Sequence, residues 1–115
     1  MLQILKDRAV TTLGVGGTEL LTADGIDVSP FSRLSFVLKN TGAADLTDLA
    51  VYWLDSFGGS DWSPADTSIS LVGGVLAATE TLEITVTDLS RAKMRVAVTG
   101  TSGETVRLTL SVTWN

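Results

Sequence analysis

RAKMRVAVTGTSGETVRLTLSVTWN, residues 91–115, is the stretch that decides the fold. From residue 105 onward apolar and polar side chains alternate without interruption, and residues 93–99 alternate in the same way. A period of two is typical of a β-strand with one buried face. The intervening Gly100-Thr101-Ser102-Gly103 suits a short turn, because glycine and small polar residues tolerate turn geometry. We therefore predict a C-terminal β-hairpin that closes the fold.

The rest of the chain shows the same period in shorter runs. Residues 33–39, 46–54 and 81–87 alternate, and we expect the first two runs to be neighbouring antiparallel strands. Shorter strands are expected at residues 9–13, 18–22 and 68–72, and no segment has a helical period. About seven or eight short strands predict an all-β, single-domain antiparallel β-sandwich over residues 1–115, jelly-roll or immunoglobulin-like. Residues 1–29 are weakly patterned, so we expect a less regular N-terminal segment.

Composition narrows the classes of partner. The net charge of −5 argues against binding to nucleic acid, because phosphate neutralisation needs a basic face. The longest apolar runs are too short to span a membrane, so no membrane partner is expected. Residues 1–8 lack the features of a secretory signal, and we expect a protein made without one.

Chemistry is weakly represented in the sequence. Histidine and cysteine are absent, which removes the commonest general base and the commonest zinc ligands. The loop carboxylates of Asp55, Asp61 and Asp66 offer oxygen ligands for calcium, but their spacing matches no EF-hand. Serine is plentiful, yet no serine–lysine motif accompanies it. We predict a non-enzyme with no cofactor and no metal site.

Charge is distributed unevenly along the chain. Every charged residue between 40 and 90 is acidic, whereas the predicted hairpin carries basic residues on its polar face. Two opposed patches of this kind are one way to dock copies head to tail, or to dock the protein on a partner. The interpretation we prefer for the charges is that they are solvated strand faces and loops that keep the protein soluble and its strand edges unpaired. The basic residues in question are Arg91, Lys93, Arg95 and Arg107.

Aromatic residues gather around the longest predicted loop, residues 55–68. Tyr52, Phe57 and Trp62 lie in or near it, whereas Trp53 and Trp114 are in phase with apolar faces and are expected in the core. Exposed aromatic rings in a loop serve as interface anchors or as platforms for sugar rings, and a tryptophan there can also cap the sandwich. The predicted interaction surface therefore comprises Phe57, Trp62, Arg91, Lys93, Arg95 and Arg107.

The segments FSRLSFVLKNTG (31–42) and LTDLAV (46–51) resemble two groups of proteins. One is the small β-sandwich virion proteins of tailed bacteriophages and prophages, such as head-decoration and other accessory proteins. The other is the adhesion-like sandwich modules of bacterial surface proteins. The first resemblance implies a symmetric homo-oligomer, such as a trimer, bound to a capsid or tail protein and located in the virion. Our leading hypothesis is accordingly a non-enzymatic phage structural protein, and the alternative is a module that binds carbohydrate or a surface polymer.

Overall fold

The computed structural model describes residues 2–22, 24–55, 62–87, 89 and 91–114. Within these residues the chain forms eight strands and one short 3-10 helix, and every strand pairing is antiparallel. The predicted all-β fold class is therefore confirmed. The elements are β1 (Leu2–Thr12), β2 (Gly17–Glu19), β3 (Ile26–Asp27), β4 (Phe31–Asn40), β5 (Asp48–Leu54), η1 (Val72–Gly74), β6 (Thr81–Val86), β7 (Lys93–Thr99) and β8 (Thr105–Trp114).

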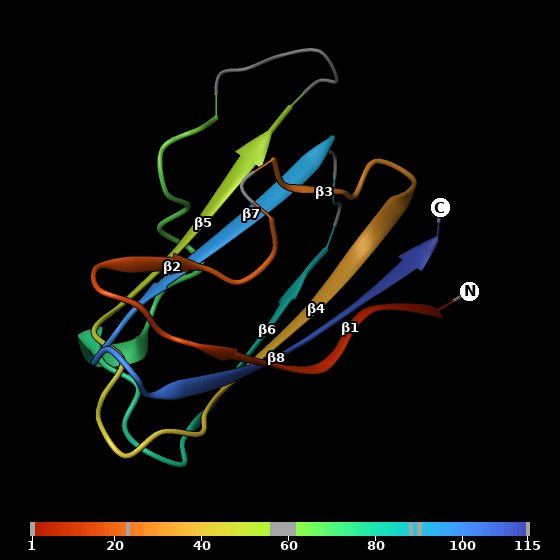
Figure 1. The fold of residues 1–115 in the computed structure, drawn as a ribbon. Helices are drawn as coiled ribbons and strands as arrows, with labels where there is room; N and C mark the ends of the chain where they lie inside the picture. The colour runs from red at the N-terminus through yellow and green to blue at the C-terminus, as the bar shows by residue number, and fades with distance from the viewer. Residues whose placement is uncertain (1, 23, 56–61, 88, 90, 115) are drawn as a thin grey trace.

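The strands form two sheets that face each other (Figure 1). The first sheet has the order β1-β8-β4-β6. In the second sheet, β5 pairs with the whole of β7, while β2 and β3 pair with different parts of β7 along its other side. Beyond β5, the irregular segment 63–66 continues the second sheet, because its backbone N–H groups donate to carbonyls of Val51 and Trp53 at 2.9 Å. No helix among the described residues is long and apolar enough to cross a membrane.

Consecutive strands do not pair with each other anywhere in the described chain. The predicted hairpin is therefore wrong, since β7 lies in the second sheet and β8 in the first. The predicted pairing of residues 33–39 with 46–54 is wrong for the same reason, because β4 and β5 lie in opposite sheets. An immunoglobulin sandwich keeps some consecutive strands side by side, so the repeated crossing between sheets identifies the jelly-roll arrangement.

The turn after β7 shows why the chain crosses between sheets. Its Gly103 N–H donates to the Leu13 carbonyl at 2.9 Å, and the Leu13 N–H donates to the Glu104 carbonyl at 2.8 Å. The turn thus bonds to the end of β1 and delivers β8 to the first sheet. A Cβ at Gly100 would lie 2.8 Å from the Leu13 Cδ1 atom and 3.0 Å from the Leu46 Cδ2 atom, so a larger residue there would have to displace these buried side chains.

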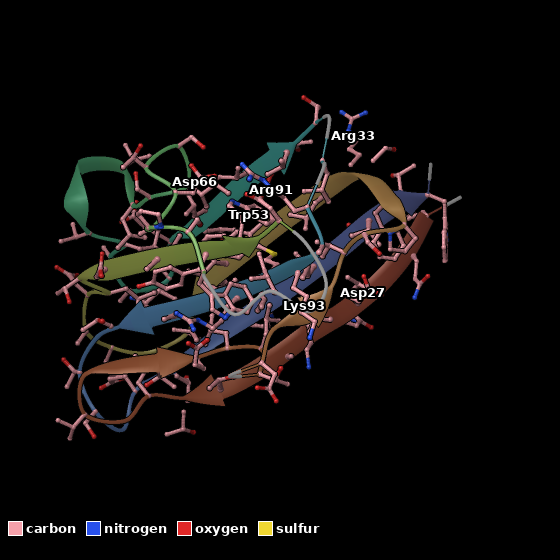
Figure 2. All side chains as sticks on the ribbon, turned by 90° about the horizontal axis from the view of Figure 1, so that it is seen from above. Asp27, Arg33, Trp53, Asp66, Arg91 and Lys93 are labelled. Atoms are coloured by element: carbon pink, nitrogen blue, oxygen red, sulfur yellow. The ribbon has the colours of Figure 1, made fainter. Side chains whose placement is uncertain are left out.

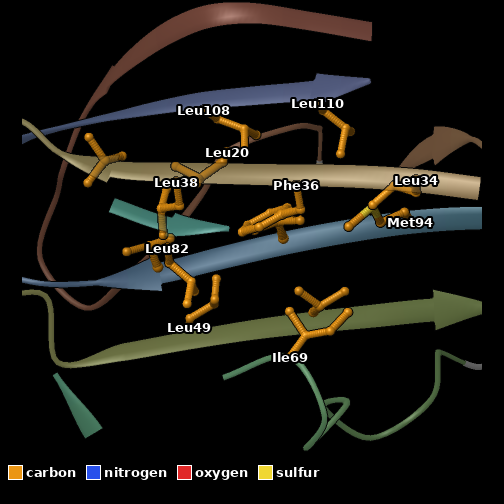
Figure 3. Packing of buried hydrophobic residues seen from close by; sticks show 14 of the residues in the cluster. Leu20, Leu34, Phe36, Leu38, Leu49, Ile69, Leu82, Met94, Leu108 and Leu110 are labelled. Carbon is orange, nitrogen blue, oxygen red and sulfur yellow. The ribbon is translucent and has the colours of Figure 1, made fainter. Parts of the chain in front are cut away.

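The core lies between the two sheets (Figure 3). The predicted apolar faces of residues 34–38, 94–98 and 106–112 are all buried in it. Trp53 is buried as expected, but Trp114 is 41% exposed. The prediction for Trp114 was wrong because β8 runs past the core at its end, where this ring packs edge-on against Phe31 with centroids 4.9 Å apart. The residues that fill the centre include Leu34, Phe36, Leu38, Leu49, Ile69, Met94, Leu108 and Leu110.

Two parts of the chain differ from their sequence pattern. The weakly patterned N-terminus contains the long strand β1, whose register against β8 shifts between Ile4 and Lys6 and again between Lys6 and Ala9. Such bulges break the alternation of side chains, which hides the strand in the sequence. Residues 68–72 form turns leading into η1 rather than the expected strand, with Ile69 still buried in the core.

Candidate interaction surface

The outer face of the second sheet gathers several of the predicted interface residues. Along β7 the apolar residues point inward, so Lys93 and Arg95 point outward. The guanidinium carbon of Arg95 lies 4.4 Å from the ring centroid of Tyr52, its cross-strand neighbour on β5, and 5.0 Å from that of Trp62. Arg95 thus makes one cation–π contact with Tyr52 and one with Trp62, and the second of these holds Trp62 against the sheet. We call Tyr52, Arg95 and Trp62 the aromatic stack.

The stack depends on a glycine between β2 and β3. Gly25 has a φ of +78°, and a Cβ at this position would lie 2.5 Å from the Cη2 atom of Trp62. The indole therefore rests directly on the Gly25 backbone, and its ring is engaged on the sheet rather than free at the end of the sandwich. Phe57, the other predicted anchor, lies outside the described residues.

Glu19 of β2 completes this face. Its Oε1 atom lies 3.1 Å from Nε of Arg95, but the contact lacks hydrogen-bond geometry. Among the described residues, neither Oε2 of Glu19 nor Nε of Arg95 has a hydrogen-bond partner. Burial raises the pKa of the Glu19 carboxyl, and the positive charge of Arg95 opposes that rise. Glu19 and Arg95 therefore form an ion pair in which one buried atom of each side chain lacks a hydrogen bond to another described residue.

A second polar cluster lies beside the end of β5 (Figure 2). Arg91 forms an ion pair with Asp55, and its guanidinium carbon lies 5.9 Å from the Trp53 ring centroid. The Trp53 indole N–H donates to Oδ2 of Asp66 at 2.9 Å, while Oδ1 accepts from the hydroxyl and N–H of Ser68 at 2.7 and 3.0 Å. Asp66 therefore ties the irregular segment 63–68 to β5.

Hydrogen bonds to the charged form lower the pKa of Asp66, first from the Ser68 hydroxyl and then from Trp53 and the Ser68 N–H. The positive charge of Arg91 acts in the same direction, and burial opposes it. A shallow hollow of about 330 Å³ adjoins this cluster. Its lining is formed by Trp53, Ser63, Pro64, Ala65, Asp66, Thr67 and Arg91.

The structure divides the basic residues that the sequence placed on one hairpin. Arg91, Lys93 and Arg95 belong to β7 or precede it, whereas Arg107 points outward from β8 on the far side of the sandwich. There Arg107 is the cross-strand neighbour of Lys39. The predicted single basic face is therefore wrong, because β7 and β8 lie in opposite sheets.

The carboxylates considered for calcium do not converge in the part of the chain that the structure describes. Asp55 pairs with Arg91, and Asp66 is occupied by Trp53 and Ser68. Asp61 lies outside the described residues. No group of three or more acidic side chains suited to a metal ion occurs among the described residues.

Asn40, a buried polar residue with several hydrogen bonds, was not singled out from the sequence. Asn40 at the end of β4 is fully buried, and its side-chain amide donates to the carbonyls of Ala44 at 2.8 Å and Leu76 at 2.9 Å. Its side-chain oxygen accepts from the Gly42 N–H at 3.0 Å. Asn40 thus joins the turn after β4 to the segment before β6. A signal was present, because position 40 continues the buried alternation of residues 34, 36 and 38.

Comparisons with known proteins show the fold. No protein-family model and no curated protein matches the chain. Among solved structures, the chain is similar to a protein of the Bacillus endospore appendages, described as a family of disulfide-linked pili, with 15% identity and a TM-score of 0.51. That match covers 100% of this chain and 92% of the other. The chain is also similar to PirA, with 18% identity, a TM-score of 0.51, and coverage of 93% and 92%.

These matches overturn the expectation of a phage virion protein. A bacterial appendage protein shares the fold over the whole chain, so the expected virion location and the capsid or tail partner are withdrawn. The KNTG sequence, residues 39–42, misled the assignment to phage proteins. Its asparagine, Asn40, is buried and forms hydrogen bonds that hold the turn after β4, which is a structural role. The sugar-binding alternative is not better supported, since the rings of Tyr52 and Trp62 already contact Arg95.

Proposed function

We propose that this chain is a structural subunit that associates with copies of itself, of the kind that builds bacterial surface appendages. The likeness in fold to an endospore appendage protein supports this proposal, because it extends over the whole of residues 1–115. We further propose that the chain works without catalysis. Its polar clusters around Asn40 and Asp66 are engaged in hydrogen bonds that hold the fold together.

The observation that carries the proposal is the apolar surface of β1. Leu2, Ile4 and Val10 are 67%, 54% and 64% exposed. Their cross-strand neighbours on β8 are Thr113, Ser111 and Arg107, which alternate with buried residues, so all three apolar side chains face outward. Exposed apolar residues gathered on one strand are typical of a surface that another molecule covers.

Residues 1–115 contain no cysteine, so disulfide bonds cannot join copies of this region, and the proposed association is through noncovalent contacts. Light scattering coupled to size exclusion, over a concentration series, tests the proposal directly. We expect the mass to rise with concentration and negative-stain images to show regular assemblies. Ile4→Lys should weaken association, whereas Val15→Lys, which changes an exposed valine in the turn after β1, should not. A monomer at every concentration would refute the proposal.

A further inference from the structure

The two outer strands of the first sheet differ in how they are protected against pairing with another chain. β1 has two register shifts, and its middle carries Lys6, Asp7 and Arg8. Arg8 also has a positive φ of 49°. Bulges and charged residues on an edge strand discourage the addition of another strand. The middle of β1 is therefore closed to strand pairing, although its apolar side chains remain exposed.

β6 lacks these protections. Its register against β4 runs without a shift from Thr81 to Val86, and Glu83 is its lone charged residue. It contains no glycine, proline or lysine, and most of its residues are β-branched. No strand pairs with its other side in the part of the chain that the structure describes. This regular open edge is the kind that readily accepts another strand.

The backbone groups at the open edge can be assigned from the pairing with β4. The Asn40 N–H donates to the Glu80 carbonyl at 3.0 Å, so residue 80 directs its carbonyl toward β4. Successive residues of a strand direct their backbone groups to opposite sides. Residues 82, 84 and 86 therefore bond to β4, and the N–H and C=O groups of Thr81, Glu83 and Thr85 face the open edge.

We propose that β6 pairs antiparallel with β6 of a second copy, with Ile84 on the twofold axis. Residues opposite each other must lie on the same face of the sheet, which leaves two registers that keep most of β6 paired. A register centred on Glu83 would place two like charges directly opposite, which is destabilising. The register centred on Ile84 instead places Glu83 opposite Thr85 and Leu82 opposite Val86.

This pairing joins the two first sheets into one continuous sheet across a closed twofold interface. It also extends the apolar layer, because Ile84 and Val86 are only partly buried within one copy. The inference rests on the proposed function, since it names one contact through which copies associate. A twofold contact at β6 leaves the apolar residues of β1 free for a second contact, which an extended assembly requires.

The absence of cysteine makes this interface testable by disulfide trapping. In the proposed register the two Ile84 residues form a non-hydrogen-bonded pair with Cα atoms about 4.5 Å apart, which lies within disulfide range. Mild oxidation of Ile84→Cys should therefore give a covalent dimer on a non-reducing gel. Val72→Cys, at an 84% exposed position outside β6, serves as the control. We expect about tenfold more dimer from I84C, because facing cysteines have effective concentrations in the mM range.

A second pair of variants protects the test against a folding defect in I84C. Mixed Glu83→Cys and Thr85→Cys chains should form a crosslinked heterodimer, whereas each variant alone should crosslink poorly. Chains that associate by light scattering but crosslink at neither site would overturn the β6 interface and leave the proposed function standing. A wild-type chain that stays monomeric at every concentration would overturn both.

Discussion

Asn40 and Arg95 are both polar residues on strands, but the structure treats them in opposite ways. Asn40 is fully buried, and both its amide nitrogen and its oxygen have partners. Arg95 lies on the outer face between two aromatic rings, where its Nε lacks a hydrogen-bond partner among the described residues. The comparison shows that the buried hydrogen bonds of Asn40 stabilise the fold, whereas the aromatic stack positions Trp62 on the outer face. Loss of the stack is therefore expected to lower the free energy of unfolding less than loss of the Asn40 side chain.

The largest expected effect is at Asn40. Asn40→Ala leaves the Ala44 and Leu76 carbonyls and the Gly42 N–H without their partner, so we expect a loss of about 3 kcal/mol in the free energy of unfolding. Urea unfolding measures it. Thr41→Ala, in the same turn, removes one exposed hydrogen bond, between its hydroxyl and that of Thr105 at 2.8 Å, and should cost about 1 kcal/mol or less. Similar losses in the two variants would contradict the role given to Asn40.

A smaller effect is expected beneath the stack. Gly25→Ala introduces a Cβ that collides with Trp62 at a positive φ, and we expect a loss of about 1 to 2 kcal/mol. Gly16 is a matched control, because its φ is +77° against +78° and nothing lies within 4 Å of the added carbon. The difference between Gly25→Ala and Gly16→Ala in urea unfolding reports the contacts of the added carbon with Trp62 and with the Met94 carbonyl, which lies 3.0 Å away. Equal losses would show that Trp62 does not rest on Gly25.

Removing the charge from the stack should cost still less. Arg95→Met keeps a long apolar stem but removes the cation between Tyr52 and Trp62, and we expect a loss of about 1 kcal/mol or less. Acrylamide quenching of tryptophan fluorescence should increase, because Trp62 is held less firmly. Lys93→Met changes a neighbouring outward cation that contacts neither ring, so its quenching should match wild type. Unchanged quenching in Arg95→Met would argue against the cation–π contacts.

The smallest effect separates two carboxylates by the sign of their pH dependence. The folded-state pKa of Asp66 is lowered, so its stabilisation is present above the ordinary value of 3.8 and lost as the pH falls through the folded pKa. The folded-state pKa of Glu19 is raised, so its contribution is present below the ordinary value of 4.5 and lost as the pH rises through the folded pKa.

Unfolding measured between about pH 3 and pH 7 tests both signs, since this range brackets the ordinary carboxyl values. Asp66→Asn should be less stable than wild type near neutral pH, and the difference should shrink in acid. Glu19→Gln should gain on wild type as the pH rises. A Glu19→Gln variant whose stability relative to wild type falls with rising pH would contradict the raised pKa of Glu19.

The sequence predicted the layers of this fold better than the pairing of its strands. The alternation in residues 106–112 correctly indicated a buried face, because burial on one side of a strand imposes a period of two. The same alternation arises whether the next strand lies beside it or in the opposite sheet, so it could not reveal that β7 and β8 are separated. That choice depends on contacts far apart in sequence, such as Gly103 with Leu13.

The candidate surface was predicted only in part. Lys93 and Arg95 lie on the outer face of the second sheet, where Arg95 contacts Trp62, whereas Arg91 lies beside the end of β5. Grouping Arg107 with these residues required the wrong strand pairing. The contact of Trp62 with Gly25 joins residues on separate loops, and no local pattern signals it. Asn40 was within reach of the sequence, since a polar residue in phase with a buried face must find partners inside the protein.

The absence of pairing between consecutive strands has a consequence for how the molecule forms. β1 pairs with β8, so the pairing of Leu2 with Thr113 joins residues at opposite ends of this region. Contacts this distant in sequence slow folding, typically to milliseconds or seconds. At a synthesis rate of about 5 to 20 residues per second, the first strand stays without its partner until the last residues of this region have been made. During that interval two surfaces are exposed to other nascent chains: the edge of β4 that later pairs with β8, and the apolar residues of β1. Molecular chaperones are therefore expected to raise the yield of native protein.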